Sequence, residues 1–180
     1  MIKWHFKYII LALLLAALNH LQAQVLSFDH GKVEFYTTSM LSDIDAITED
    51  VKVKLDIQSG EVELAIAIES FDFEYELMQE HFNEKYMESD KYPMATFKGK
   101  ITQDISKITE EIEIEVAGEM TIHGVTKEVS LKTRISKKND LTVVKVKIPV
   151  VFKDYNVDEP EILTKSLAKD VEVKSTLYLK

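Results

Sequence analysis

The sequence predicts an all-β domain of about eight antiparallel strands, and three observations support this. Apolar and polar residues alternate with a period of two along most of the chain, as on strands that bury one face. The links between the alternating runs are mostly short and carry hairpin residues, such as "SG", "HGVT" and "KKND". Gly99 and Gly118 interrupt strands, as glycines do where a sheet bends sharply, which favours a barrel over a sandwich.

The strand pattern can be followed from one end of the chain to the other. In residues 51–57, for example, Val51, Val53 and Leu55 share one face. Pro149 lies within a run at an outward position, which predicts a bulge or a poorly paired edge. A barrel of eight strands is either filled by its side chains or holds one small or slender ligand. The predicted strands are residues 32–38, 51–57, 62–68, 95–103, 111–124, 127–135, 141–152 and 171–180.

One stretch breaks the period of two. Its large apolar residues recur every three or four positions, which predicts one short helix in the crossover around residues 74–87. Asp72 is the predicted N-cap and Pro93 marks the exit. One stripe of this helix is expected to face the barrel, with Leu77 widening it, while an acidic stripe faces water. The apolar stripe is Tyr75, Met78, Phe82 and Tyr86; the acidic stripe is Glu76, Glu80 and Glu84.

The same helix carries Glu80, His81 and Glu84, which raises the alternative of a metal site. His81 lies about 100° round the helix from Glu80, and the order is not H-E-x-x-H. Zinc and copper sites usually need more nitrogen or sulfur ligands than one local His supplies. The sequence also lacks a Gly-rich phosphate loop, a framed Ser nucleophile and any Cys. We therefore expect no catalytic residues, no metal and no cofactor, and rank a metal-dependent activity here below two binding hypotheses.

The N-terminal segment predicts export. Two lysines are followed by an apolar run of about eleven residues and then by "LQA", which is typical of a signal peptide cleaved after Ala23. The run is shorter than the ~18 apolar residues of a spanning helix, so no stable membrane anchor is expected. Residues 1–23 are interpreted as the signal peptide and residues 24–180 as a single domain.

The charge restricts the partners of the chain. Removing the leader, with its two lysines and no acids, takes the net charge from −9 to −11. This acidity argues against nucleic acid as a partner and favours solubility. With no Cys the chain has no disulfide and no lipid anchor on an N-terminal Cys. A bacterial periplasmic location fits these features, and full secretion stays open.

Three blocks of sequence resemble the YceI-like family. Residues 73–101 contain a helical stretch followed by "YPMATF", similar to the family's "YP-x-A-x-F" strand entry. Residues 118–131, "GEMTIHGVTKEVSL", are similar to its "G-x-L-T-I-x-G-V-T" hairpin, and "LAKDVEVKSTLYL" resembles its last strand. Lys127-Glu128 stands where the family commonly has Arg-Pro, so the chain resembles a divergent branch.

This resemblance implies a lipocalin-like, eight-stranded barrel in the periplasm. It implies an apolar channel that holds a polyisoprenoid or similar amphiphilic lipid or quinone, for transport, storage or sequestration. The alternative is a filled barrel that acts as a protein-interaction or stress-response module, and pairing of two copies at the mouth is left open. The candidate ligand-binding residues are Phe35, Leu64, Ile66, Ile68, Tyr75, Met78, Phe82, Tyr86, Phe97, Ile114, Val116, Met120, Val146, Ile148 and Phe152.

Overall fold

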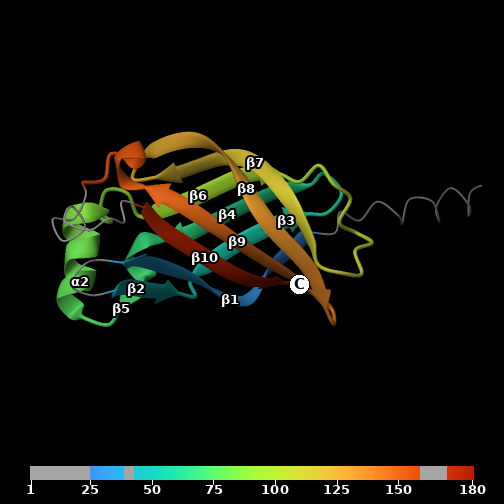
Figure 1. Cartoon of the computed structure of the whole chain (residues 1–180), viewed down its shortest axis with the longest axis horizontal. Coiled ribbons are helices and arrows are strands. Elements are labelled where there is room, and N and C mark those ends of the chain that lie inside the picture. The colour runs from blue at the N-terminus through green and yellow to red at the C-terminus, as the bar shows by residue number, and fades with distance from the viewer. Residues whose placement is uncertain (1–24, 39–42, 159–169) are drawn as a thin grey trace, which may run out of the picture.

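The structure, a computed structural model, describes residues 25–38, 43–158 and 170–180 (Figure 1). The predicted signal peptide lies outside the described residues. The strands are β1 (Val25–Thr38), β2 (Asp43–Thr48), β3 (Val51–Asp56), β4 (Glu61–Ala67), β5 (Asp72–Phe73), β6 (Met94–Lys100), β7 (Ile112–Ile122), β8 (Val125–Lys138), β9 (Leu141–Val151) and β10 (Asp170–Leu179). Single helical turns also occur at η2 (Ile68–Ser70) and η4 (Phe152–Tyr155).

The strands form one antiparallel sheet that closes on itself. Their order is β10-β9-β8-β7-β6-β4-β3-β1-β2-β5. A further pairing of β10 with β1, from Phe28 opposite Leu179 to Tyr36 opposite Glu172, completes the ring. In Figure 1 the red β10 accordingly lies beside the blue β1. The predicted all-β antiparallel barrel is confirmed.

β2 and β3 occupy a single position in the barrel wall. Val33 of β1 lies opposite Thr48 of β2, and Leu26 lies opposite Leu55 of β3, in one continuous register. The barrel therefore has eight strand positions, as predicted. The sequence reading missed β2 because its buried residues, Ala46 and Thr48, are too small to give a clear apolar alternation.

The predicted helix is present and lies across one end of the barrel (Figure 1). It consists of α2 (Glu76–His81), followed without a break by the wider π-helical turn η3 (Phe82–Tyr86). The N–H of Met87 donates to the carbonyl of Phe82 at 2.8 Å, five residues back, which ends the helix. Asp72 is not its N-cap, because that residue belongs to β5 and the helix begins after Tyr75.

The β7–β8 hairpin is attached to its neighbours along a diagonal. β7 and β8 pair over the whole length of β7. In the described residues β6 pairs with residues 117–121 of β7, whereas β9 pairs with residues 133–138 of β8. One end of the hairpin is thus bonded on the β6 side and the opposite end on the β9 side. Pro149 lies past the last β9 residue that pairs with β8, opposite Glu172 of β10, which confirms the prediction of a poorly paired edge.

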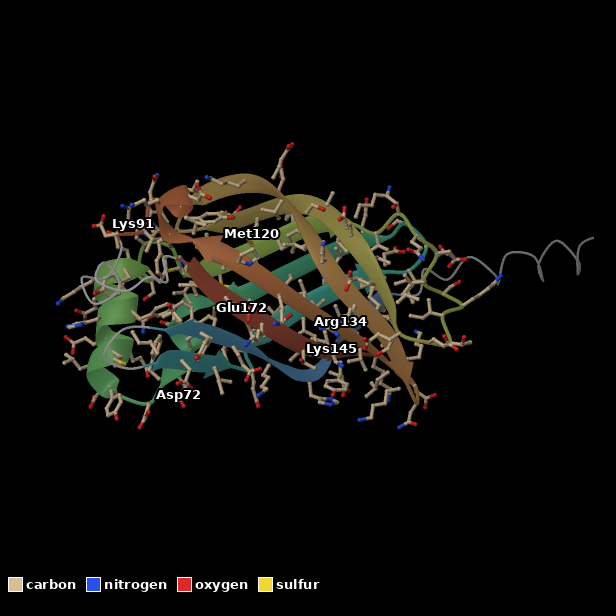
Figure 2. The ribbon with its side chains drawn as sticks, viewed as in Figure 1. Asp72, Lys91, Met120, Arg134, Lys145 and Glu172 are labelled. Atoms are coloured by element: carbon tan, nitrogen blue, oxygen red, sulfur yellow. The ribbon has the colours of Figure 1, made fainter. Side chains whose placement is uncertain are left out.

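The barrel interior is apolar and both of its ends are covered. Inward side chains of every long strand form one continuous core, as the period-two patterns require. α2 and η3 cover one end, where Phe82 is 8% exposed. The loop after β6 covers the other end, with Ile101 and Ile105 buried. Charged side chains lie outside: Figure 2 shows Arg134, Lys145 and Glu172 on the outer face of β8, β9 and β10.

Candidate ligand-binding site

Two apolar cavities lie inside the barrel, one behind the other. The first, here called the cap cavity, has a volume of about 90 Å³, lies under α2 and η3, and is walled by apolar atoms. The second, here called the far cavity, has a volume of about 70 Å³ and extends toward the opposite end, where Ile101 lines it. Dry apolar cavities of this kind attract small apolar molecules because water gains no hydrogen bonds there. The site therefore suits hydrocarbon.

Most of the predicted site residues line these cavities. Tyr75, Met78, Tyr86 and Ile114 line neither one. Those at the cap cavity are Phe35, Leu64, Ile66, Ile68, Phe82, Phe97, Met120, Ile148 and Phe152. Those at the far cavity are Leu64, Phe97, Val116, Val146 and Ile148.

Ile114 is 6% exposed and packs in the core, whereas Met78 and Tyr86 are half-buried against it. Tyr75 is 57% exposed, so the expectation that it faces the barrel is wrong. Tyr75 is the N-cap, with extended backbone, and the spacing of a helix does not apply to it. Leu77 is 61% exposed and does not widen the buried stripe.

Four of the cap-cavity lining residues absent from the predicted set come from outside the strands. Phe71, Met87, Tyr155 and Val157 all line the cap cavity. None of them belongs to a strand, so no period-two pattern marks them. Their only signal is that large apolar residues stand next to charged ones in loops, which many surface loops also show.

An aromatic cluster holds the helix against the barrel. The ring of Phe82 lies 5.8 Å from the ring of Phe35, 5.8 Å from Phe71 and 4.9 Å from Phe73. Tilted and edge-to-face pairs at such separations each add about 0.5–1.5 kcal/mol beyond the area they bury. Phe82 therefore anchors the turn η3 in the end of the barrel.

A polar contact fastens the segment after the helix. Nε2 of His123, in the β7–β8 turn, lies 3.0 Å from Oε2 of Glu88. Nδ1 of His123 lies 3.3 Å from the carbonyl oxygen of Tyr155, and the ring of Tyr92 contacts the imidazole edge-on at 4.4 Å. We call residues 76–92 the cap, because they cover this end and are fixed by Phe82 and Glu88. Figure 2 shows Lys91 at this end of the barrel.

Tyr155 closes the wall of the cap cavity beside the cap. Its burial raises the pKa of its phenol above the ordinary value, and the charge of Asp154 adds to the rise. Nζ of Lys127 lies 2.8 Å from Oδ1 of Asp154, which joins β8 to η4 across the edge where β8 and β9 do not pair. Side chains therefore hold this part of the wall together.

The alternative metal site is not assembled. Glu80 and Glu84 are exposed, and Nε2 of His81 lies 3.0 Å from the ammonium group of Lys85. Within residues 25–38, 43–158 and 170–180, no group of three or more His, Asp or Glu side chains could hold a metal ion. The ammonium group of Lys85 beside His81 would also repel a metal cation.

The fold and the interior define a class of protein: a closed antiparallel barrel with an apolar interior and a helical cap. The model of the YceI-like domain matches residues 24–179, so the chain belongs to the YceI-like domain family. None of the curated proteins compared with it matches. In the part of the chain that the structure describes, no helix is both long and apolar enough to cross a membrane.

Solved structures share the fold. One is a polyisoprenoid-binding domain from Saccharophagus degradans implicated in plant cell wall breakdown, 15% identical, with a TM-score of 0.72 over 86% of this chain and 97% of that one. BcnA from Burkholderia cenocepacia is 19% identical, with a TM-score of 0.68 over 82% and 95%. The YCEI protein of Campylobacter jejuni is 20% identical, with a TM-score of 0.50 over 71% and 80%. At these identities the likeness concerns the fold.

Proposed function

We propose that this chain binds one slender apolar or amphiphilic lipid, of the polyisoprenoid or isoprenoid-quinone class, inside the barrel. The observation that carries the proposal is the pair of apolar cavities aligned under a helical cap. Burial of hydrocarbon there contributes roughly 25 cal/mol per Å² of apolar surface removed from water. The name of the Saccharophagus domain, which describes polyisoprenoid binding, supports the same ligand class.

The chain's role is to bind rather than to catalyse. Export by the signal peptide, with action in the periplasm, is part of the proposal. There a carrier would take up, store or release a water-insoluble lipid, and the net negative charge of the chain would keep it soluble. Pairing of two copies at the barrel mouth stays a prediction.

The modest size of the cavities favours a second candidate, a filled barrel that serves as an interaction module. An apolar cavity of ~150 Å³ accommodates a molecule the size of benzene. The cavities here, of about 90 and 70 Å³, are each smaller than that. Uptake of a longer chain therefore requires the cap or the interior side chains to move.

Native purification followed by mass spectrometry of the extracted lipid tests the proposal. A bound isoprenoid or quinone is the expected result. Delipidated protein that takes up neither a prenol nor an isoprenoid quinone would overturn carriage and favour the filled barrel.

A matched pair of variants locates the ligand. Ala95 lines the cap cavity, whereas Ala117, on a strand nearby, is exposed on the outer face. Ala95→Leu is expected to reduce uptake because its added atoms occupy the cavity, and Ala117→Leu is expected to leave it unchanged. Equal uptake by both variants would place the ligand outside the barrel.

A further inference from the structure

The two cavities are separated by a small set of side chains. Leu64, Phe97 and Ile148 line both of them. Leu64 and Phe97 lie opposite each other on β4 and β6, and Phe97 lies opposite Met120 on β7. Phe97 is 7% exposed and brings the one large ring of the three to the boundary.

The ring of Phe97 packs against two glycines, Gly99 and Gly118, which we call its seat. Gly99 of β6 and Gly118 of β7 lie opposite each other in the sheet, on its inward side. A Cβ at Gly99 would lie 2.5 Å from Cζ of Phe97, and one at Gly118 would lie 2.8 Å from the same atom. A side chain at Gly99 would therefore displace the ring, whereas one at Gly118 would first meet the β6 backbone, at 2.3 Å from the carbonyl oxygen of Lys98.

The conformation of the backbone does not require these glycines. Gly31, Gly60 and Gly124 have positive φ, a conformation that L side chains rarely adopt, whereas Gly99 and Gly118 do not. Gly99 and Gly118 are therefore explained by the space that they leave. At Gly99 the ring of Phe97 takes most of that space, and at Gly118 both the β6 backbone and the ring take it.

We propose that Phe97, seated on Gly99 and Gly118, sets the length of the apolar chain that this barrel accepts. With the ring seated, a linear hydrocarbon under the cap is confined to the cap cavity. With the ring replaced by a smaller side chain, the cap and far cavities join into one channel along the barrel, and a longer chain fits. This inference rests on the proposed function and adds the residue that selects among apolar chains by length.

The experiment measures the affinities of delipidated protein for linear 1-alkanols whose chain grows by one methylene at a time. In the wild type the gain in affinity per methylene is expected to fall once the cap cavity is filled. In Phe97→Leu that break moves to a longer alkanol. The long alkanol should gain on the short one by about tenfold, which corresponds to burying about two more methylenes.

Phe28→Leu is the matched control. Phe28 packs against the core but lines neither cavity, so the same change there leaves both spaces as they are. It is expected to leave the break at the wild-type length. Because the break is a comparison among ligands on one protein, a moderate loss of stability does not move it.

The outcomes distinguish a failure of the role proposed for Phe97 from a failure of lipid carriage. Alkanol binding with the same length profile in wild type, Phe97→Leu and Phe28→Leu overturns the role of Phe97 and leaves carriage intact. Failure of every alkanol, prenol and quinone to bind the wild type overturns carriage and this inference with it.

Discussion

Nε2 of His123 lies 3.0 Å from Oε2 of Glu88, which joins the β7–β8 turn to the segment that follows the cap helix. The side chain of His123 is only 9% exposed, while that of Glu88 is 44% exposed. Both residues have positive φ, of 50° and 43°. The contact therefore joins two residues that both adopt the uncommon backbone conformation with positive φ.

His123→Asn tests this contact without disturbing the turn, since Asn tolerates positive φ and Asn-Gly suits a two-residue hairpin. The shorter side chain no longer reaches Glu88. The loss of about 1 kcal/mol should speed release of a bound lipid roughly fivefold. Stopped-flow transfer of a fluorescent prenol to vesicles measures the rate. His81→Asn, on the outer side of the cap, is the control, and equal rates for the two variants would show that the His123 contact does not hold the cap.

Gly118→Ala is expected to destabilise the barrel more than Gly99→Ala does. A Cβ at Gly118 would lie 2.3 Å from the carbonyl oxygen of Lys98 and 2.6 Å from Cα of Gly99, so the β6 backbone must move. We expect a loss of about 3 kcal/mol, the upper end for overpacking. Urea unfolding measures it, and a loss below about 0.5 kcal/mol would contradict the close approach.

At Gly99 the nearest atoms belong to the Phe97 side chain, which can move. The double variant Gly99→Ala, Phe97→Leu should therefore be more stable than the sum of its single changes indicates, because the smaller side chain leaves room for the new methyl group. A double-mutant cycle in urea measures the coupling. Strict additivity would mean that the ring does not occupy the seat in solution.

The raised pKa of Tyr155 makes stability depend on pH in the alkaline range. Because the folded pKa lies above that of the unfolded chain, the contribution of Tyr155 is constant below about pH 10 and is lost as the pH rises further. Tyr155→Phe should therefore flatten the fall in unfolding free energy above about pH 10. Tyr75→Phe, on the exposed start of the cap, is the control. Parallel curves for Tyr155→Phe and wild type would contradict the prediction.

Two buried threonines differ in the hydrogen bonding of their hydroxyl groups. Thr37 and Thr48 are 3% and 2% exposed, but Oγ1 of Thr37 finds no hydrogen-bond partner among the described residues. Oγ1 of Thr48 lies 2.7 Å from Oγ of Ser70 and accepts the N–H of Asp50 at 3.0 Å. Thr37→Val should raise stability by about 1 kcal/mol and Thr48→Val should lower it by about 1–2 kcal/mol. Thermal unfolding of both variants checks the opposite signs.

The strands and the helix could be predicted because each leaves a periodic mark on the sequence. Residues such as Val51, Val53 and Leu55 are buried as their alternation requires. The predicted buried face of the helix is confirmed at Phe82 and wrong at Tyr75, because spacing alone does not reveal where the first turn begins. The prediction of a barrel depended on the number of strands and on two glycines, and closure by β1 and β10 agrees with it.

The division of the interior could not be predicted. Gly99 and Gly118 predict a sharp bend of the sheet, and the structure adds that a Cβ at Gly99 would meet the ring of Phe97 and one at Gly118 the backbone of β6. These contacts depend on the register which places Gly99 opposite Gly118, and two residues nineteen positions apart show no local pattern of contact. The lining residues Met87, Tyr155 and Val157 were missed because irregular backbone leaves no period.

The diagonal attachment of the β7–β8 hairpin has a consequence for amide hydrogen exchange. Near the cap, the edge of β8 at residues 125–131 is not backed by β9, while Lys127 and Asp154 supply a salt bridge between side chains. An amide without a backbone acceptor exchanges through small local openings rather than through unfolding of the whole domain. Deuterium from the solvent should therefore exchange into the amides of residues 125–131 well before it exchanges into those of residues 133–138. The β8 edge near the cap thus opens locally more often than the opposite end of the same strand.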